Sequence, residues 1–513
     1  MPTGEHSLSD DEDAVPGRTV RWWAIARSAV LGALTLLLSA CGDDRPSCLP
    51  PVSPDRPITP PIDAPPRPGP VRLYLDGSGS MRGFVGNTGP SPYREVAHAM
   101  LGSLRRSASE FEVFRFAAGI ERRDYSDRLA ADILDASFYS SKPALGANPK
   151  QIPAGETHLH DVLKQAAAQP TVTTVVVTDL FLSAAEVHGG ENSPLRQALA
   201  DILHKGMSIA LVGIQAPFTG RIYDLATTRE SIKFTNGQRP FYILLIGNDA
   251  QVRTLYATLQ AEVLGTPVMG PHHSTFFSPR ALPASGWVPR LELNTGTREA
   301  TLLAKSAASE APFQIAVGRR GGGASIALER QDGDSAWFAG QAVVPDVRRA
   351  TLKNILHFYT TGRHGCENGW VEDDERPGLV ELGQVQPDRL SFNVMREPAA
   401  TFGFRPKVAY VLDTTVTFPS LHAAPEARQW IKDWSYDATH EAALLKRVAQ
   451  REEQREKQQQ VQRPSAKAEP PSSEPILFPT LNLESLGDLM VQITKDQHSS
   501  ERIHAFRLVY NME

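Results

Sequence analysis

Apolar strands alternate with amphipathic helical stretches in the part of the chain that follows residue 70. Short apolar, β-branched runs predict strands at 71–75, 111–117, 172–178, 207–214 and 241–247. Apolar residues that repeat every three or four positions predict helices at 92–106, 129–138, 159–168, 193–204 and 250–263. This alternation predicts an α/β domain over residues 71–265, built on a doubly wound, mostly parallel sheet.

The pattern changes beyond about residue 266, where short strands and turns replace the helices. Strand-like runs occur at 313–317, 325–328, 337–343, 390–394 and 408–418. They predict a β-rich, sandwich-like domain over residues 266–437. Residues 438–475 predict a charged, solvated helix followed by a disordered spacer. Residues 476–513 predict a helix and a strand that pack on the β-rich domain.

A hairpin-like extension is predicted between two strands of the first domain. The segment 217–240 carries turn signals at Phe218-Thr219-Gly220 and at Asn236-Gly237. The strand-like run 231–234 precedes the second turn signal, which favours a hairpin.

The amino-terminal residues 1–40 have the pattern of a signal peptide. Arginines precede the apolar run 28–38, which is short for a bilayer span. It ends in Leu38-Ser39-Ala40-Cys41, which resembles the lipobox of bacterial lipoproteins. The resemblance implies cleavage before Cys41, lipidation of Cys41 and attachment to a membrane of the bacterial cell envelope, and Gly42 favours the outer membrane. A plain signal anchor and a buried core helix are the alternatives.

Residues 41–70 form a proline-rich linker in this interpretation. Proline at nearly every second position from 46 to 70 favours an extended polyproline II stalk without a core.

Composition narrows the function further. A chain of 513 residues is too long for one core. Its formal net charge of −5 provides no basic field for nucleic acid, so nucleic-acid binding is not expected. The three cysteines are too few for a disulfide scaffold. A bridge between Cys48 and Cys366 and two unpaired thiols both remain open.

Oxygen-bearing side chains gather after two of the predicted strands. The first strand runs directly into Asp76-Gly77-Ser78-Gly79-Ser80, and the apolar run 175–177 ends in Thr178-Asp179. A third segment, Gly155-Glu156-Thr157, precedes a predicted helix. Ligands of open parallel sheets bind at the carboxyl ends of strands, and hydroxyl and carboxylate oxygens suit a hard divalent cation.

These three segments, in this order, resemble the metal-ion-dependent adhesion site of von Willebrand factor type A domains. The resemblance implies that Ser78, Ser80 and Thr157 offer hydroxyl oxygens and that Asp76 and Asp179 are the acidic members. It implies Mg²⁺ as the cation, with Ca²⁺ or Mn²⁺ as alternatives, and a carboxylate of a protein or glycan partner as a further ligand. The chain departs from the family pattern at two positions, Glu156 and Leu180.

A structural interpretation competes with the metal site. Asp76 to Ser80 could form a plain turn, Thr157 a helix cap and Asp179 a strand end. His158 and His160 stand two apart at a helix start, so they are expected to point in different directions and to be solvated. Trp430 and Trp434, four apart, are expected to pack on a core.

The function favoured by these features is that of an envelope-anchored lipoprotein, not an enzyme, that binds a protein or glycan partner through a divalent cation. A metal-dependent hydrolase of the envelope and a structural component of an envelope assembly are the alternatives. No nucleophile motif of the Gly-x-Ser-x-Gly type occurs in the chain.

Overall fold

The structure is a computed structural model of the chain. It describes residues 69–86, 91–139, 157–180, 182, 193–223, 225–227, 231–278, 287–293, 300–303, 314–317, 324–330, 339–346, 349–359, 370–375, 378–386, 389–394, 403–405, 408–461, 475–497 and 501–510. The predicted signal peptide, Cys41, the proline-rich linker up to residue 68, Glu156 and the spacer 464–474 lie outside the described residues, as do Cys48 and Cys366.

The first half of the chain is an α/β unit built on a seven-stranded sheet with the strand order β3-β2-β1-β4-β6-β5-β7. These strands are β1 (Val71–Asp76), β2 (Phe111–Phe116), β3 (Ile120–Arg123), β4 (Thr173–Thr178), β5 (Met207–Ile222), β6 (Ile232–Asn248) and β7 (His272–Phe277). Strand β7 pairs with β5, so the sheet continues past residue 265.

The sheet is mixed, and the expectation of a mostly parallel sheet is wrong. Only β1 pairs in parallel, with β2 on one side and β4 on the other; every other neighbouring pair in this sheet is antiparallel. The reason is that the predicted hairpin is not an insert between two strands of the sheet: its two arms are the sheet strands β5 and β6 themselves. Strands β5 and β6 pair along their whole length, and β6 returns between β4 and β5.

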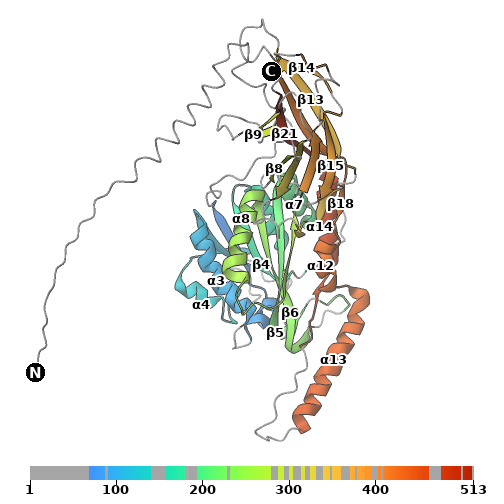
Figure 1. Cartoon of the computed structure of the whole chain (residues 1–513). Coiled ribbons are helices and arrows are strands. Elements are labelled where there is room, and N and C mark those ends of the chain that lie inside the picture. Colours follow the sequence, from blue (N-terminus) through green and yellow to red (C-terminus); the bar gives the residue numbers. More distant parts are fainter. Residues whose placement is uncertain are drawn as a thin grey trace, which may run out of the picture.

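Helices cover both faces of this sheet, as Figure 1 shows. On one face, α3 (Pro92–Ser107) and α8 (Asp249–Leu259) share a core with residues such as Leu73 and Val175. On the other face, α5 (Leu159–Ala168) and α7 (Pro194–His204) pack on residues such as Val176 and Leu244. The alternation of buried residues along each strand supplies both cores.

Serine caps fix the starts of two of these helices. The hydroxyl of Ser91 accepts a hydrogen bond from the backbone N–H of Arg94, and the hydroxyl of Ser193 accepts one from Arg196. A proline follows each serine at the first helical position, where its missing N–H costs nothing.

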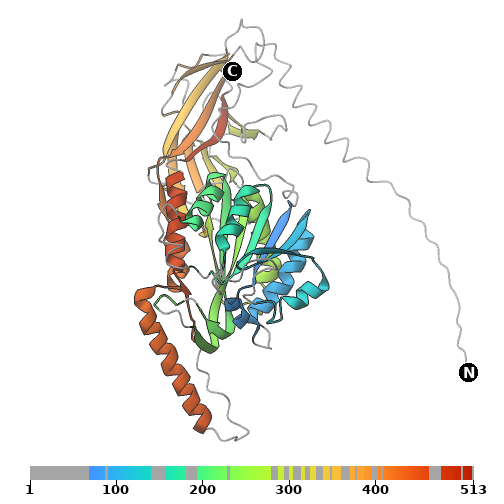
Figure 2. The same cartoon turned by 180° about the vertical axis from the view of Figure 1, so that it is seen from behind.

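The second half of the chain is rich in β-strands, and Figure 2 shows them gathered at one end of the molecule. A six-stranded sheet has the order β14-β13-β17-β21-β10-β9, and a four-stranded sheet has the order β15-β16-β11-β8. Every pair is antiparallel except β10 with β21. The strands are β8 (Trp287–Leu293), β9 (Ala300–Leu303), β10 (Gln314–Val317), β11 (Ala324–Arg330), β13 (Thr351–Tyr359), β14 (Trp370–Glu375), β15 (Val380–Gln386), β16 (Arg389–Val394), β17 (Tyr410–Phe418) and β21 (Glu501–Tyr510).

One apolar core joins these two sheets. Phe392 of the smaller sheet and Phe506 of the larger one make an edge-to-face contact within it, with ring centroids 4.9 Å apart. Strand β21 is held to β17 by a buried ion pair as well, since Arg507 donates hydrogen bonds of 2.6 and 2.7 Å to the two carboxylate oxygens of Asp413.

The C-terminal helix lies where the α/β unit meets elements of residues 266–437. Helix α14 (Leu483–Gln497) joins the core beside α7 and α12 (Gln429–Asp433), where Trp430 and Trp434 are buried as expected. The sequence predicts that this helix packs on residues 266–437, and it does contact α12 and residues such as Val343 and Leu421, but it also packs on α7 of the α/β unit. The strand that follows it, β21, joins the six-stranded sheet.

Helix α13 (Ala438–Val461) begins against the β5–β6 hairpin and then runs out from the molecule, as Figures 1 and 2 show. Leu444 and Val448 are buried at its first turns. The carboxylate of Glu441, which is fully buried, accepts a hydrogen bond from the backbone N–H of Thr227. The sequence predicts a solvated helix, and its first turns are instead part of the core.

Candidate metal centre

The two aspartates of the predicted site lie at the carboxyl ends of the adjacent parallel strands β1 and β4. Leu75 is aligned with Val177, so Asp76 and Thr178 follow side by side. The hydroxyl of Thr178 donates a 2.6 Å hydrogen bond to Oδ2 of Asp76. The backbone N–H of Ser78 donates to Oδ1 of Asp76 at 2.8 Å. The Asp76 carboxylate is therefore held in one orientation at the edge of the sheet.

The two serines lie in the turn that follows β1. Their hydroxyl oxygens are 2.9 Å apart, and both side chains are buried. Gly77 allows this turn to pass close to Arg115, whose Nη2 donates to the carbonyl oxygen of Gly77 at 2.8 Å. A Cβ atom at Gly77 would lie 2.2 Å from Nε of Arg115, so a larger residue would displace the arginine.

Thr157 reaches the same edge of the sheet through strand β2. The backbone N–H of Gly77 donates to the carbonyl oxygen of Phe116, and the N–H of His158 donates to the carbonyl oxygen of Ala117. Two neighbouring residues thus tie the Asp76 turn and the Thr157 segment to one strand end. The Oγ1 atom of Thr157 is buried and has no hydrogen-bond partner among the described residues.

Asp179 is fully buried, and both of its carboxylate oxygens lack a hydrogen-bond partner within the described part of the chain. Nη2 of Arg239, on β6, lies 3.5 Å from Oδ2 of Asp179. Burial first, and the negative charge of Asp179 second, raise the pKa of Asp76 to about 7, against the hydrogen bonds from Thr178 and Ser78 that lower it. Two buried carboxyl groups therefore share one region, with the Arg239 guanidinium beside Asp179.

Sequence reasoning missed Arg239. It lies in the segment 217–240, whose purpose the sequence did not show, two residues before the predicted strand 241–247, and the structure places it within β6. A charged residue next to an apolar strand is the one signal that could have pointed to it, because such a residue needs a counter-charge when it is buried.

The donor set fits a hard divalent cation. The five proposed ligands offer only oxygen atoms, and all five side chains are buried at one edge of the sheet: Asp76, Ser78, Ser80, Thr157 and Asp179. Buried oxygens without partners are costly unless a cation or donor satisfies them. Mg²⁺ held by these residues would supply an electrophilic position for an oxygen ligand of a partner.

Leu180, one of the two departures from the family pattern, adopts the left-handed conformation with φ of 52°. Its N–H donates to the hydroxyl of Thr178 at 3.1 Å, and its side chain is buried in the core beside α5 and α7. The backbone here takes a conformation that glycine adopts freely, and the leucine adds a buried side chain at the cost of strain.

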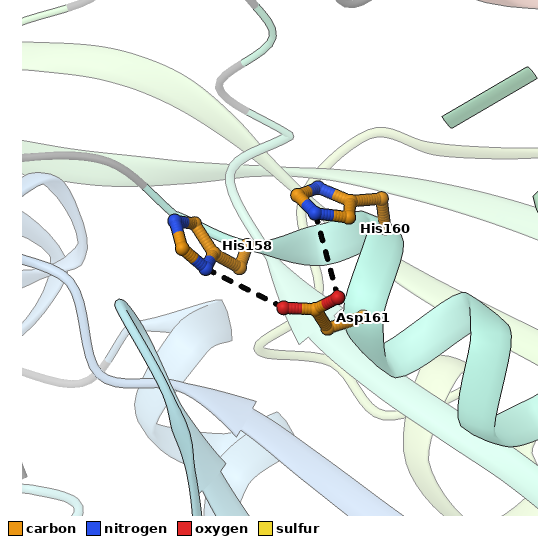
Figure 3. Close-up of side chains that lie close together, drawn as sticks. All are labelled: His158, His160 and Asp161. Atoms are coloured by element: carbon orange, nitrogen blue, oxygen red, sulfur yellow. Dashed lines mark ion pairs between the residues drawn. The ribbon is translucent and has the colours of Figure 1, made fainter. Parts of the chain in front are cut away.

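The two histidines beside Thr157 do not point apart, contrary to the expectation from the sequence. Their ring centroids are 5.3 Å apart, and both rings face the carboxylate of Asp161 (Figure 3). The expectation assumed helical geometry at both positions, but His158 is the N-cap, with φ of −86° and ψ of 64°. The helical rotation per residue therefore does not apply between the two side chains.

Comparisons of the chain with models of protein families, with curated proteins and with solved structures return no match. In the described residues, no helix has both the length and the apolar character that crossing a membrane requires.

Proposed function

We propose that this protein is an envelope-anchored lipoprotein that binds a protein or glycan partner through a divalent cation, held at a metal-ion-dependent adhesion site in a von Willebrand factor type A-like domain. The observation that carries the proposal is the pair of buried carboxylates, Asp76 and Asp179, at the ends of β1 and β4. Both oxygens of Asp179 and the hydroxyl oxygen of Thr157 lack a hydrogen-bond partner among the described residues. The predicted lipid anchor at Cys41 and the proline-rich stalk would present this site away from the membrane.

A binding role follows from the charge balance of the site. Two carboxylates, three hydroxyl groups and a nearby arginine leave a bound Mg²⁺ with a net positive character. Such an ion keeps its affinity for one more anionic oxygen, and Mg²⁺ retains exchangeable water ligands that a carboxylate can replace. The partner would therefore be recognised by an Asp or Glu side chain, or by an acidic sugar.

The test combines metal binding with partner capture. The full-length chain is titrated with Mg²⁺ by calorimetry, and envelope extracts are then passed over the immobilised protein in Mg²⁺ or in chelator. The variant Thr157→Val removes one proposed ligand without removing charge, and His98→Gln on α3 serves as an exposed control. We expect chelator to abolish capture, Thr157→Val to weaken it at limiting Mg²⁺, and His98→Gln to leave it unchanged.

The same experiment separates the alternatives. Capture that persists in chelator, together with a loss of thermal stability, would indicate that the ion is structural. Metal-dependent turnover of a phosphate or ester substrate that is lost in Thr157→Val would indicate a hydrolase.

A further inference from the structure

His158, His160 and Asp161 form a compact cluster at the start of α5. Their ligand atoms all lie within 4.8 Å of one another, and no other such group of three His, Cys, Asp or Glu residues occurs in the described part of the chain. Nδ1 of His158 is 3.4 Å from Oδ2 of Asp161, and Nε2 of His160 is 3.4 Å from Oδ1 of Asp161. Figure 3 shows both rings turned towards the carboxylate between them.

Each of these two distances, measured to a different oxygen of the Asp161 carboxylate, is close to the spacing of two neighbouring ligands around a tetrahedral ion. Zn²⁺ binds imidazole nitrogen and carboxylate oxygen at about 2.0–2.2 Å, which places neighbouring tetrahedral ligands roughly 3.4 Å apart. Two imidazoles and one carboxylate also form the ligand set of many zinc sites that keep one position open. The cluster differs in chemistry from the oxygen-lined site, because nitrogen ligands favour Zn²⁺ and its neighbours in the transition series over Mg²⁺.

The surroundings of the cluster allow an ion to enter. The side chains of His158, His160 and Asp161 are 30, 23 and 44% exposed, so solvent reaches all three. Two features oppose a cation: the positive end of the α5 helix dipole, and Nζ of Lys164, which lies 3.9 Å from Oδ1 of Asp161. Both act weakly through solvent, whereas three side chains that bind an ion directly would act at bonding distance.

We propose that His158, His160 and Asp161 form a second metal site, which takes Zn²⁺ or a similar transition-metal ion and leaves a coordination position open to a ligand. His158 directly follows Thr157, so this site lies on the same rim as the oxygen-lined site. The second site does not require the first, since the two share no ligand.

The test is zinc titration of the full-length chain by calorimetry in excess Mg²⁺, with Co²⁺ absorption as a probe of coordination geometry. We expect His160→Gln and Asp161→Asn each to weaken binding at this site roughly tenfold or more, and to lose the visible absorption of four-coordinate Co²⁺. Exposed His98 supplies the matched control, and His98→Gln should bind Zn²⁺ and Co²⁺ like the parent.

Asp179→Ala keeps the two proposals apart. It should lose Mg²⁺ binding and keep the zinc site, whereas His160→Gln should show the reverse pattern. The zinc site is refuted if His160→Gln and Asp161→Asn, both folded by circular dichroism, bind Zn²⁺ and Co²⁺ as the parent does. If Asp179→Ala binds Mg²⁺ as the parent does, the result would count against the oxygen-lined site and would leave the zinc site untouched.

Discussion

Arg239 and Asp179 form a buried ion pair, with 3.5 Å between Nη2 and Oδ2 and neither side chain exposed to solvent. The guanidinium also lies over the ring of Phe218, 5.4 Å from its centroid. A fixed positive charge beside a proposed metal ligand partly neutralises that ligand in the apo protein. It also repels an incoming cation, and burial strengthens both effects.

Replacing this arginine should therefore change stability and metal affinity in opposite directions. In Arg239→Met, Asp179 loses its counter-charge, so the free energy of unfolding in chelator should fall by about 3–5 kcal/mol, as for other broken buried pairs. The affinity for Mg²⁺ should rise roughly tenfold or more, because the competing charge is gone. Denaturant unfolding in chelator and calorimetric Mg²⁺ titration measure the two quantities.

Arg221 offers the matched control for this experiment. It lies on the same hairpin, in β5, is exposed and pairs with Ser231. Arg221→Met should leave both quantities close to those of the parent. An unchanged or weaker Mg²⁺ affinity in Arg239→Met would contradict the role assigned to the arginine.

Two threonines at the site should respond differently to loss of their hydroxyl groups. The Thr157 hydroxyl has no hydrogen-bond partner in the described residues, so Thr157→Val should not lower stability in chelator but should weaken Mg²⁺ binding roughly tenfold or more. The Thr178 hydroxyl donates to Asp76, so Thr178→Val should cost about 1.5–3 kcal/mol in chelator. Equal Mg²⁺ affinity of Thr157→Val and the parent would remove Thr157 from the ligand set.

Leu180 provides a test of backbone strain. Its φ of 52° should cost about 1–2 kcal/mol relative to glycine, while its buried side chain contributes roughly 2–5 kcal/mol relative to alanine. Burial therefore outweighs strain, and Leu180→Gly and Leu180→Ala should both destabilise the protein. Leu180→Ala keeps the strain, however, and should be about 1 kcal/mol less stable than Leu180→Gly.

Chemical denaturation of the two Leu180 variants decides this point. In ordinary helical or extended backbone alanine is the more stabilising of the two residues, so the usual order would show that Leu180 is not strained.

His273 should report on pH through its tryptophan neighbours. Its ring stacks on Trp430 and contacts the edge of Trp434, with centroid distances of 5.8 and 5.2 Å. Although His273 is exposed, partial desolvation, and then the neighbouring charge of His272, lower its pKa, and Asp433 opposes the shift. Tryptophan fluorescence should therefore show a transition with its midpoint below about 6.5, the ordinary value for histidine.

The sign of the effect on stability follows from the same shift. The unfolded chain takes up a proton at His273 at higher pH than the folded protein, so stability should decrease as the pH falls below about 6.5. His273→Asn should abolish the fluorescence transition, and His440→Asn, an exposed change on α13, should retain it. A midpoint at or above that of free histidine would disagree with the packing.

Local patterns in the sequence predict most single elements of the α/β unit. Helix α5 begins and ends at the predicted residues, and α7 starts one residue after the predicted start at Ser193 and ends at the predicted His204, because caps and apolar spacing act within a few residues. The direction of β6 could not be predicted in this way. Its pairing with β4 depends on contacts between residues far apart in the chain.

The proposed metal ligands also follow from local signals, since each lies after a strand end or before a helix. Arg239 does not, because its partner Asp179 is brought near only by the β4–β6 pairing. The prediction for the His158 cluster is wrong for a local reason: it applies helical geometry to a residue that caps the helix.

The segment 475–510 has a consequence for how the protein matures. Its helix completes the core on one face of the α/β sheet, and its strand β21 lies between β17 and β10 in the six-stranded sheet. The ribosome synthesises this segment last among the parts of the core and of the sheet to which the segment contributes. Both halves should therefore stay incompletely folded until synthesis reaches this segment.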